Sequence, residues 1–429
     1  MKSSPPRIAI LAAKDLRRNT RVLRQALSLR SAGWEVTIAA LEVPHNPVDA
    51  GIEAVRIDMA HPLQRAQQRL AVHTPDRPDA RQLVRNNDTP EVPGRPLVSH
   101  LLRSVRHVAM PFGHTIISLQ FARGCVSMLA GLDFDVVQAH DATALRAASR
   151  LAHRSGARLV YDAVEFVDSR SVFIDTPLAR LARRYESSRE CRLVRRAAKV
   201  FAIGPAMRDW MTERYRIDPP IVVRNCRIFE QAHRDNALRS AADIGTNERV
   251  ILYPNSITPG RGVEEFLEAL KQLDDTVHAV FLGADTRSAY TRKILLLAKR
   301  LGLASRVHLL PPCKPEQVVA MAAGADIGVI PFKNTSMNNY YALPNRLFEL
   351  IMARVPVAAS AFPEMKKVID EHGIGITFDP ESVDAMARAL RELLAPDELA
   401  ATRSRLAKAA RELCWENESR AYLAALSEV

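Results

Sequence analysis

Residues 326–360 constrain the fold of this chain more than any other stretch. Apolar runs at the two ends, Asp326–Pro331 and Val355–Ala359, have the length and composition of strands buried on both faces, which is typical of parallel sheets. A polar loop and then a helix lie between them. The apolar stripe of this helix consists of Leu347, Leu350 and Ile351. This strand–helix–strand unit predicts an α/β chain.

Two residues of that helix carry further information. We expect Pro344 at its first position, where the missing N–H would have no partner in any case. Glu349 lies one turn in, beside the apolar stripe. It is either an ordinary surface carboxylate that complements the helix dipole or a ligand of sugar hydroxyls at the carboxyl edge of the sheet, where open parallel sheets bind ligands.

Length and composition indicate a soluble, two-domain protein. With 429 residues, each of two domains can bury its own core, and 47% apolar with 25% charged residues is ordinary for globular chains. The five cysteines are scattered, which argues against a zinc site or disulfide framework and suits a reduced cytosol. We find no signal-peptide core and no membrane span, so we expect a cytoplasmic protein.

The chain is basic, with 60 lysines and arginines against 48 acids and a net charge of +12. Solvated arginines explain this as well as an anionic membrane surface or nucleotide diphosphates do. No nucleic-acid-binding motif accompanies the charge, so nucleic acid is not an expected partner. The basic segment Arg180–Arg196 is predicted as a solvated helix.

The N-terminal part alternates strands and helices. Strands at Arg7–Ala13 and Glu35–Leu41 flank a helix over Thr20–Ala32, and a later strand, Phe134–Ala139, leads into His140. With right-handed crossovers this order builds a Rossmann-like domain whose ligand edge includes His140. Arginines near the first loop either line a cleft or are solvated on the outer helix face; they are Arg17, Arg21 and Arg24.

Residues 60–125 interrupt the alternation. Between His61 and Arg123 lie nine arginines, no lysine and seven prolines, with apolar clusters at Leu101–Val108 and Ile116–Phe121. Basic segments with apolar anchors suit an anionic membrane surface, and packing on the domain itself is an equal alternative.

Three segments carry a resemblance to a known family: LPNRLFELIMARVPVAAS from Leu343, GRGVEEFLEAL from Gly260 and DVVQAHDATAL from Asp135. They are similar to segments of retaining two-domain (GT-B) glycosyltransferases, in particular the large fourth family. The resemblance implies two facing Rossmann-like domains, at residues 1–228 (with the insertion at 60–125) and 229–412, and a last helix at 413–429 that returns to the first domain. It implies transfer of a sugar from a nucleotide-diphosphate sugar to a glycan or lipid-linked acceptor in cell-surface polysaccharide, lipopolysaccharide or glycolipid synthesis.

By the same resemblance, several residues receive roles in the donor site. Glu349 would bind the nucleotide ribose, and the amides near Asn345 and Arg346 would face the diphosphate. Arg261, before a helix N-terminus, would clamp the diphosphate and act catalytically, so that no metal cofactor is needed. Asn338 and Asn339 would contact the donor.

On the acceptor side the resemblance assigns His140 a catalytic role, with Glu165, Arg17 and Arg21 nearby. Two positions depart from the family pattern: Tyr341 replaces a glutamate that contacts the donor sugar, and Ser256 replaces an arginine. These departures keep two alternatives open, a non-catalytic nucleotide-sugar-binding or scaffold protein and another GT-B enzyme such as an epimerase. The protein is expected in the cytoplasm, with peripheral attachment to the inner face of the membrane.

Overall fold

A computed structural model describes residues 4–16, 19–43, 52–57, 113–167 and 177–429. Within these ranges two sheets form, and the strand pairs that define their registers are parallel. By contacts, the chain divides into two compact units, residues 1–26, 33–159 and 172–193 in the first, and 27–32, 160–171 and 194–429 in the second. The predicted α/β class is confirmed.

The first sheet has seven strands in the order β3-β2-β1-β4-β5-β6-β7. Their bounds are β1 Arg7–Asp15, β2 Glu35–Glu42, β3 Glu53–Arg56, β4 Val136–His140, β5 Arg158–Ala163, β6 Lys199–Ala202 and β7 Ile221–Val222. Apolar runs bury the centre of this sheet, since Ile8 to Ala12 and Val36 to Ala40 are almost wholly inaccessible on both faces apart from Thr37. The chain leaves β1 toward β2 and later returns to add β4 on the other side, so the order reverses between β1 and β4.

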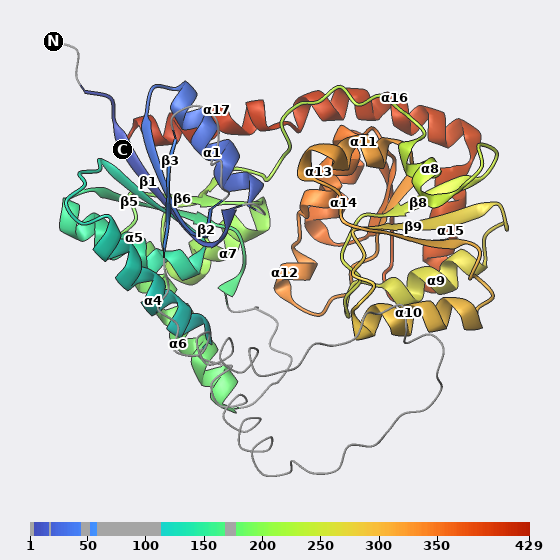
Figure 1. Cartoon of the computed structure of the whole chain (residues 1–429), viewed down its shortest axis with the longest axis horizontal. Coiled ribbons are helices and arrows are strands. Elements are labelled where there is room, and N and C mark those ends of the chain that lie inside the picture. The colour runs from blue at the N-terminus through green and yellow to red at the C-terminus, as the bar shows by residue number, and fades with distance from the viewer. Residues whose placement is uncertain (1–3, 17–18, 44–51, 58–112, 168–176) are drawn as a thin grey trace, which may run out of the picture. The chain divides into compact units, whose positions relative to one another are not determined.

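Helices cover the first sheet. They are α1 Thr20–Ser31, α4 Gly113–Met128, α5 Ala142–Ser155, α6 Pro177–Val194 and α7 Pro205–Tyr215. Figure 1 shows α4 and α5 lying side by side, and α4 buries Phe121, Ala122 and Cys125. The end of the predicted insertion therefore packs on its own domain, while residues 58–112, which carry the other apolar cluster, lie outside the described ranges.

The basic segment predicted as a solvated helix, Arg180–Arg196, lies mostly in α6, where exposed arginines such as Arg184 and Arg192 alternate with a buried face. In α6, Glu186 and Arg189 are buried and form an ion pair at 2.5 Å. Thr115 of α4 also donates a hydrogen bond to Glu186. A buried charge is stable only when it is paired, and the i,i+3 spacing supplies the partner here.

The second sheet has six strands in the order β10-β9-β8-β11-β12-β13. Their bounds are β8 Arg249–Tyr253, β9 Val277–Leu282, β10 Val307–Leu310, β11 Ile327–Ile330, β12 Val357–Ser360 and β13 Gly375–Phe378. Asp326 enters β11 as a buried carboxylate that accepts a hydrogen bond from the Val250 amide at 2.8 Å and pairs with Arg239 at 2.7 Å. This pairing fixes β11 against β8 at the start of both strands.

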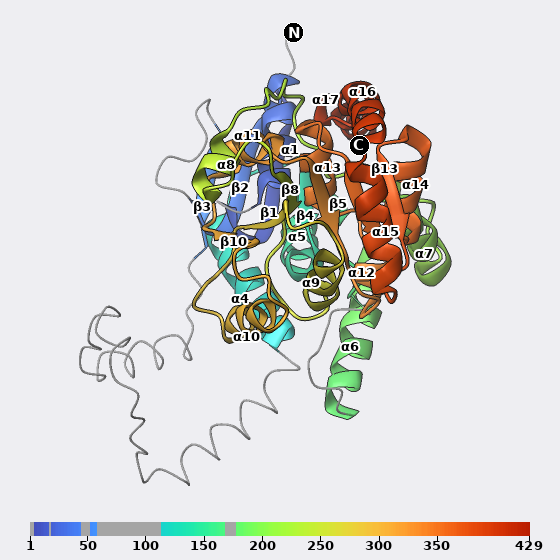
Figure 2. The same ribbon diagram turned by 90° about the vertical axis from the view of Figure 1, so that its right-hand side faces the viewer.

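Two helix layers sandwich the second sheet. The helices that follow β7 in the chain are α8 Ala237–Ala242, α9 Val263–Lys271, α10 Ala289–Arg300, α11 Val318–Ala323, α12 Met337–Tyr340, α13 Asn345–Met352, α14 Pro363–His372, α15 Val383–Leu394, α16 Pro396–Glu412 and α17 Trp415–Ser427, with a 3-10 turn η4 at Pro315–Gln317. Figures 1 and 2 show α9 and α10 on the opposite side of β8 from α11. Each layer has its own apolar core, one against α9, α10 and α15 and the other against α11, α13 and α16.

The last helix, α17, packs against β6 and β7. Its Tyr422 ring lies 5.1 Å from that of Phe201, and Glu418 pairs with Arg224 at 2.7 Å. The indole N–H of Trp415 donates to the Ser28 hydroxyl at 2.9 Å.

The prediction for the start of helix α13 needs correction. Pro344 is the residue that caps α13, at φ −70° and ψ 145°, rather than its first helical residue. The fixed φ of proline is compatible with either position.

Candidate functional site

The order of the second sheet reverses between β8 and β11, which opens a crevice at the carboxyl ends of these strands. The loops that follow the two strands meet there. The Lys333 amide donates to the Gly260 carbonyl at 3.1 Å. Gly262 has φ of 66°, and a Cβ at this position would stand 1.8 Å from the Pro331 carbonyl oxygen. Only glycine allows this approach, so it sets the geometry of the crevice.

Helix α13 follows the crevice and places Glu349 beside it. The predicted stripe of Leu347, Leu350 and Ile351 is fully buried. Glu349 itself is only 7% exposed, and its carboxylate pairs with the Arg346 guanidinium one turn earlier. Glu349 is therefore not an ordinary surface carboxylate. A buried carboxylate that is paired with a single arginine still has free lone pairs on its oxygens, which can accept hydrogen bonds from further donors such as sugar hydroxyls.

Glu349 and Arg346 line a cavity of about 70 Å³. Its other walls come from the residues that end or follow β8, β9 and β10 and from α11 and α13, namely Leu252, Pro254, Leu282, Gly283, Pro312, Cys313, Val318, Ala322 and Leu350. An apolar slot with one carboxylate–guanidinium pair at its wall can hold a flat ring while the charged pair binds attached hydroxyls. Asn345, at the start of α13, accepts a hydrogen bond from the Asn225 amide at 2.5 Å.

Arg261 lies on the loop after β8, just before α9. Its guanidinium stacks over the Phe332 ring at 4.1 Å, and its carbonyl accepts a hydrogen bond from the Tyr253 hydroxyl at 3.4 Å. Burial lowers the pKa of the Arg261 guanidinium, yet arginine stays charged at any ordinary pH. A guanidinium that is fixed in place beside a helix N-terminus is suited to binding an anion.

Asn338 and Asn339 lie on α12 and hold backbone in place. The Asn338 side chain accepts from the Phe166 amide at 2.7 Å and donates to the Phe166 carbonyl at 3.0 Å. Asn339 donates to the Lys333 carbonyl at 3.3 Å and the Thr335 hydroxyl at 2.8 Å. Donor contact by either asparagine stays a prediction.

Tyr341, at the position where the family pattern has a glutamate, is part of an aromatic group. Its ring lies 5.7 Å from that of Phe166 and 4.9 Å from that of Tyr340. Phe166 in turn meets Trp210 edge-on at 5.3 Å. The loop after β5, which also carries Glu165, is thereby joined to the loop after β11 by rings as well as by Asn338.

In the first unit, His140 ends β4 beside Ala12 of β1, where the strand order of that sheet reverses. It is 3% exposed. The next residue, Asp141, caps α5 through bonds from the Thr143 and Ala144 amides and pairs with Lys14 at 3.4 Å.

The arginines near the first loop divide into two cases. Arg21 and Arg24 are buried, so the alternative that they are solvated on an outer face is wrong for both. Arg17 lies outside the described residues. A catalytic role of His140 and an acceptor role of Arg21, Arg17 or Glu165 stay predictions.

Sequence reasoning missed two residues of the crevice. Asn255, two residues after the end of β8, has a buried side-chain nitrogen with no partner among the described residues. Cys313 lines the cavity, and burial raises the pKa of its thiol. The available signal for both was their place just beyond a buried strand, where ligands of parallel sheets bind.

Among the described residues no cluster of three or more His, Cys, Asp or Glu side chains could hold a metal ion. In the same ranges, no helix has the length and apolar character needed to cross a membrane. All five cysteines are free.

Comparison with known proteins gives the family. Residues 235–413 match the model of the family "Glycosyl transferases group 1", and residues 50–226 match that of "Glycosyltransferase Family 4". A relative from Mycolicibacterium gilvum, D-inositol 3-phosphate glycosyltransferase, is 28% identical over 38% of this chain and 35% of its own length. A putative colanic acid biosynthesis glycosyl transferase from Escherichia coli is 25% identical over 37% of this chain and 39% of its own. The chain thus spans less than half the length of either relative.

Solved structures share the fold over nearly the whole chain. Sucrose-phosphate synthase from Thermosynechococcus elongatus superposes with a TM-score of 0.72 at 14% identity, over 99% of this chain and 100% of its own. HepE from Anabaena, in complex with UDP-glucose, superposes with a TM-score of 0.66 at 14% identity, over 99% and 100%. These matches confirm the GT-B fold. The chain therefore belongs to the group 1 glycosyltransferases, enzymes of the GT-B fold, and resembles glycosyltransferase family 4.

Proposed function

We propose that this protein transfers a sugar from a uridine-diphosphate sugar to an acceptor hydroxyl, with retention of the anomeric configuration. The observation that carries the proposal is the placement of Glu349: a buried carboxylate in an apolar slot at the carboxyl ends of β8, β9 and β10. Parallel sheets bind nucleotides at this edge. The choice of uridine rests on the structurally similar HepE, whose structure was solved in complex with UDP-glucose.

The donor would be held by residues of the second unit. The pyrimidine enters the slot beside Gly283 and Cys313, and the ribose hydroxyls donate to Glu349. The diphosphate lies between the first amides of α13, at Asn345 and Arg346, and the guanidinium of Arg261. Arg261 is positioned in advance by Phe332, so it stabilises the charge that develops on the leaving diphosphate with little reorganisation.

The proposed reaction needs no metal cofactor, because Arg261 and the helix N-terminus supply the positive charge. A catalytic role of His140 in the transfer is part of this proposal and rests on the family resemblance. An excess of chelator should leave the initial rate unchanged. Inhibition that magnesium reverses would contradict the proposal for the leaving group.

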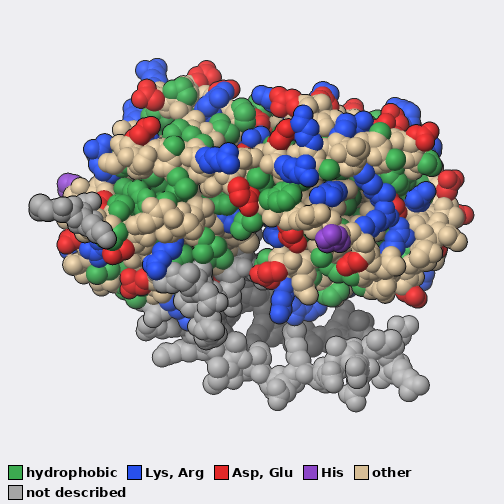
Figure 3. All heavy atoms as spheres, turned by 90° about the horizontal axis from the view of Figure 1, so that it is seen from above, with side chains coloured by type: hydrophobic (Ala, Val, Ile, Leu, Met, Phe, Trp, Pro, Cys, Tyr) green, Lys and Arg blue, Asp and Glu red, His purple; other side chains and the backbone are tan. Residues whose placement is uncertain are grey.

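The acceptor is proposed to be a glycan or a lipid-linked molecule of the cell surface. The support is the E. coli relative, whose name refers to colanic acid biosynthesis. Attachment to the inner face of the membrane rests on the basic insertion at 60–125, most of which lies outside the described residues. On the face shown in Figure 3, basic and acidic side chains are interspersed, which gives that face no single-sign patch.

Calorimetric titration with UDP, GDP and ADP, and with the same nucleotides carrying glucose, tests the proposal. UDP should bind best, and Glu349→Ala should weaken it about 10- to 150-fold, the range for a hydrogen bond to a charged group. Glu316→Ala, which removes an exposed carboxylate on η4, is the matched control and should bind UDP like the parent.

The outcomes separate two functions. If Glu349→Ala folds and binds UDP like the parent, the ribose site is wrong. Binding of a UDP-sugar with no transfer to lipid-linked or glycan acceptors would favour a non-catalytic nucleotide-sugar-binding protein. The observation in favour of that alternative is Tyr341, which places a ring against Phe166 where the family pattern has a carboxylate.

A further inference from the structure

A second cavity lies at the opposite edge of the strands from the usual ligand edge. Its volume is about 590 Å³, within the range of small-molecule sites. The walls come from the end of α6 and the turn into β6, and from the end of α7 and the turn into β7. Because β6 starts at Lys199 and β7 at Ile221, the cavity is at their amino ends. The proposed donor site lies at carboxyl ends, so this is a separate site.

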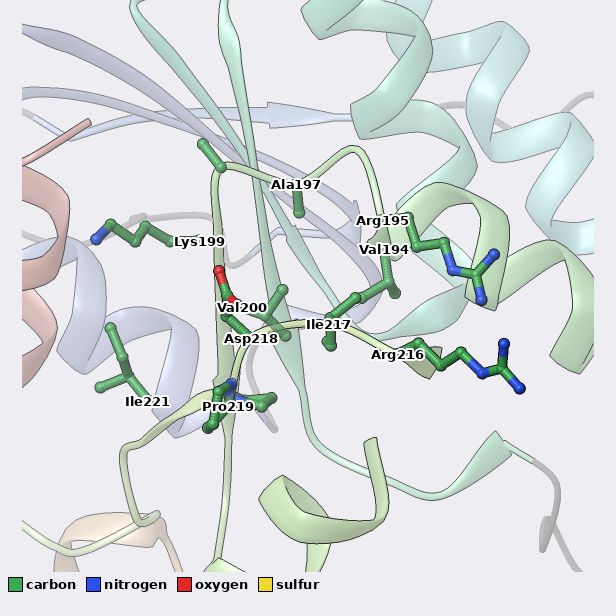
Figure 4. Close-up of a pocket in the computed structure, with 12 residues that line it drawn as sticks. Val194, Arg195, Ala197, Lys199, Val200, Arg216, Ile217, Asp218, Pro219 and Ile221 are labelled. Carbon is green, nitrogen blue, oxygen red and sulfur yellow. The ribbon is translucent and has the colours of Figure 1, made fainter. Parts of the chain in front are cut away.

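The walls of this cavity combine apolar residues, three cationic side chains and one carboxylate, that of Asp218. Val200, Ile217 and Pro219 are among the apolar residues that line it. Figure 4 shows the side chains of Arg195 and Arg216 extending to the same side, and that of Lys199 extending the opposite way. The Lys199 ammonium is already paired with Glu428 at 2.5 Å.

The two arginines are not neutralised by neighbours. In the described part of the chain, neither Arg195 nor Arg216 has a carboxylate within ion-pair distance. Arg195 is oriented by a bond from its Nε to the Tyr215 carbonyl at 2.8 Å, which leaves its terminal nitrogens available. Two guanidinium forks on one side of a cavity match the oxygens of a phosphate group.

The backbone at Arg216 adds an independent observation. Arg216 ends α7 in the left-handed conformation, at φ 53° and ψ 57°, a position that glycine usually occupies. A Cβ makes this conformation unfavourable. An arginine here places a cation at the cavity at a local conformational cost.

We propose that this cavity binds an amphiphilic phosphate ester, a phosphate group carried on an apolar body. The phosphate lies against the guanidinium groups of Arg195 and Arg216, and the apolar body covers Val200, Ile217 and Pro219. Such a ligand is either a small soluble phosphate ester or the headgroup region of a phospholipid. The inference goes beyond the proposed sugar transfer and does not depend on it.

Octyl phosphate, used below its micelle concentration, is the probe. Each buried methylene should favour binding by roughly fourfold, so calorimetry should find octyl phosphate bound at least about tenfold more tightly than inorganic phosphate. Octanol, which lacks the phosphate, should not bind measurably. Arg216→Gly should weaken octyl phosphate binding by about tenfold or more, because it removes a charged donor. Its melting temperature should not fall, since glycine adopts the left-handed conformation freely.

Arg354→Gly is a matched control, because Arg354 also has positive φ, at 56°, and does not line this cavity. This variant loses the same charge and Cβ and should bind octyl phosphate like the parent. UDP should not displace octyl phosphate. Vesicles containing phosphatidic acid distinguish the sources: binding that falls with Arg216→Gly identifies a lipid ligand, and binding of octyl phosphate alone identifies a soluble one.

Several results would overturn the proposal. They are failure of octyl phosphate to saturate the protein, parental affinity in Arg216→Gly, equal losses in Arg216→Gly and Arg354→Gly, and displacement of octyl phosphate by UDP. Equal losses would mean that net charge, and not this cavity, governs binding. Displacement by UDP would place the phosphate in the donor site.

Discussion

At the scale of single residues, the close approach of two loops at Gly262 controls the proposed donor site. We predict that Gly262→Ala destabilises the protein by two additive effects. A positive φ costs roughly 1–2 kcal/mol for a residue with a Cβ, and the contact with the Pro331 carbonyl adds about 1–3 kcal/mol of overpacking. The loops must separate, so UDP binding should weaken as well.

Gly302→Ala is the matched control for this change. Gly302 has φ of 78°, and a Cβ there would meet nothing within 4 Å. Denaturant unfolding of both variants therefore separates the cost of conformation from the cost of contact. Equal losses of stability, with UDP binding retained in both, would show that the Pro331 contact does not shape the crevice.

At the scale of helices and strands, much of the structure could be predicted because it depends on local pattern. The strand expected at Glu35–Leu41 is β2, and the helix expected from Thr20 is α1. The stripe around Leu350 correctly identified the buried face of α13. Such elements follow from apolar periodicity, which the sequence displays directly.

Contacts between distant segments could not be predicted in this way. Asn338 and Phe166 are 172 positions apart, and no spacing rule relates them. The buried pair in α6 and the buried state of Arg21 likewise depend on which element packs on top. Within the candidate site, Glu349 and Arg261 carried recognisable motif signals, whereas Asn255 and Cys313 had only a position after a strand.

Asn338 provides the prediction at this scale, because its side chain bonds both backbone groups of Phe166. Asn338→Leu should leave these groups without their partners. Two hydrogen bonds of about 0.5–1.5 kcal/mol each correspond to roughly 5- to 150-fold faster amide exchange at Phe166 if the loop opens locally. Hydrogen exchange measured on a peptide that contains residues 160–167 checks this.

Asn339→Leu is the control for this experiment. Asn339 bonds only within its own loop in the contacts described, to Lys333 and Thr335. Its variant should speed exchange around residues 333–341 and leave Phe166 protected. Unchanged exchange at Phe166 in Asn338→Leu would mean that the aromatic contacts with Tyr341 and Trp210 alone hold the loop.

At the scale of the whole molecule, contacts between segments far apart in the sequence hold the second unit together. Helix α17 packs its Tyr422 against Phe201, and α14 presents Glu364 to the first turn of α7. Glu364 is 5% exposed and accepts a hydrogen bond from the Ala206 amide at 2.5 Å. Charged groups in such contacts make global stability depend on pH.

Burial raises the pKa of Glu364 above its usual 4.5, and the bond from Ala206 only partly opposes this. The native protein therefore holds this proton to higher pH than the unfolded chain does. As pH rises above about 4.5, the unfolded chain loses its proton first, so this group lowers the free energy of unfolding. Glutamine keeps the acceptor for Ala206 and does not titrate.

We predict that Glu364→Gln and the parent differ least at pH 4, and that the variant becomes progressively more stable than the parent toward pH 7. Glu398→Gln is the control of opposite sign. A hydrogen bond from Thr402 lowers the pKa of Glu398, and the Glu398 carboxylate therefore stabilises the native state as pH rises. The free energy of unfolding of Glu398→Gln should accordingly fall below that of the parent as pH rises. Urea unfolding at pH 4, 5, 6 and 7 measures both. The decisive quantity is the free energy of unfolding of Glu364→Gln minus that of the parent. If this difference stays constant from pH 4 to pH 7, or falls as it does for Glu398→Gln, Glu364 is ionised in the native protein as readily as in the unfolded chain.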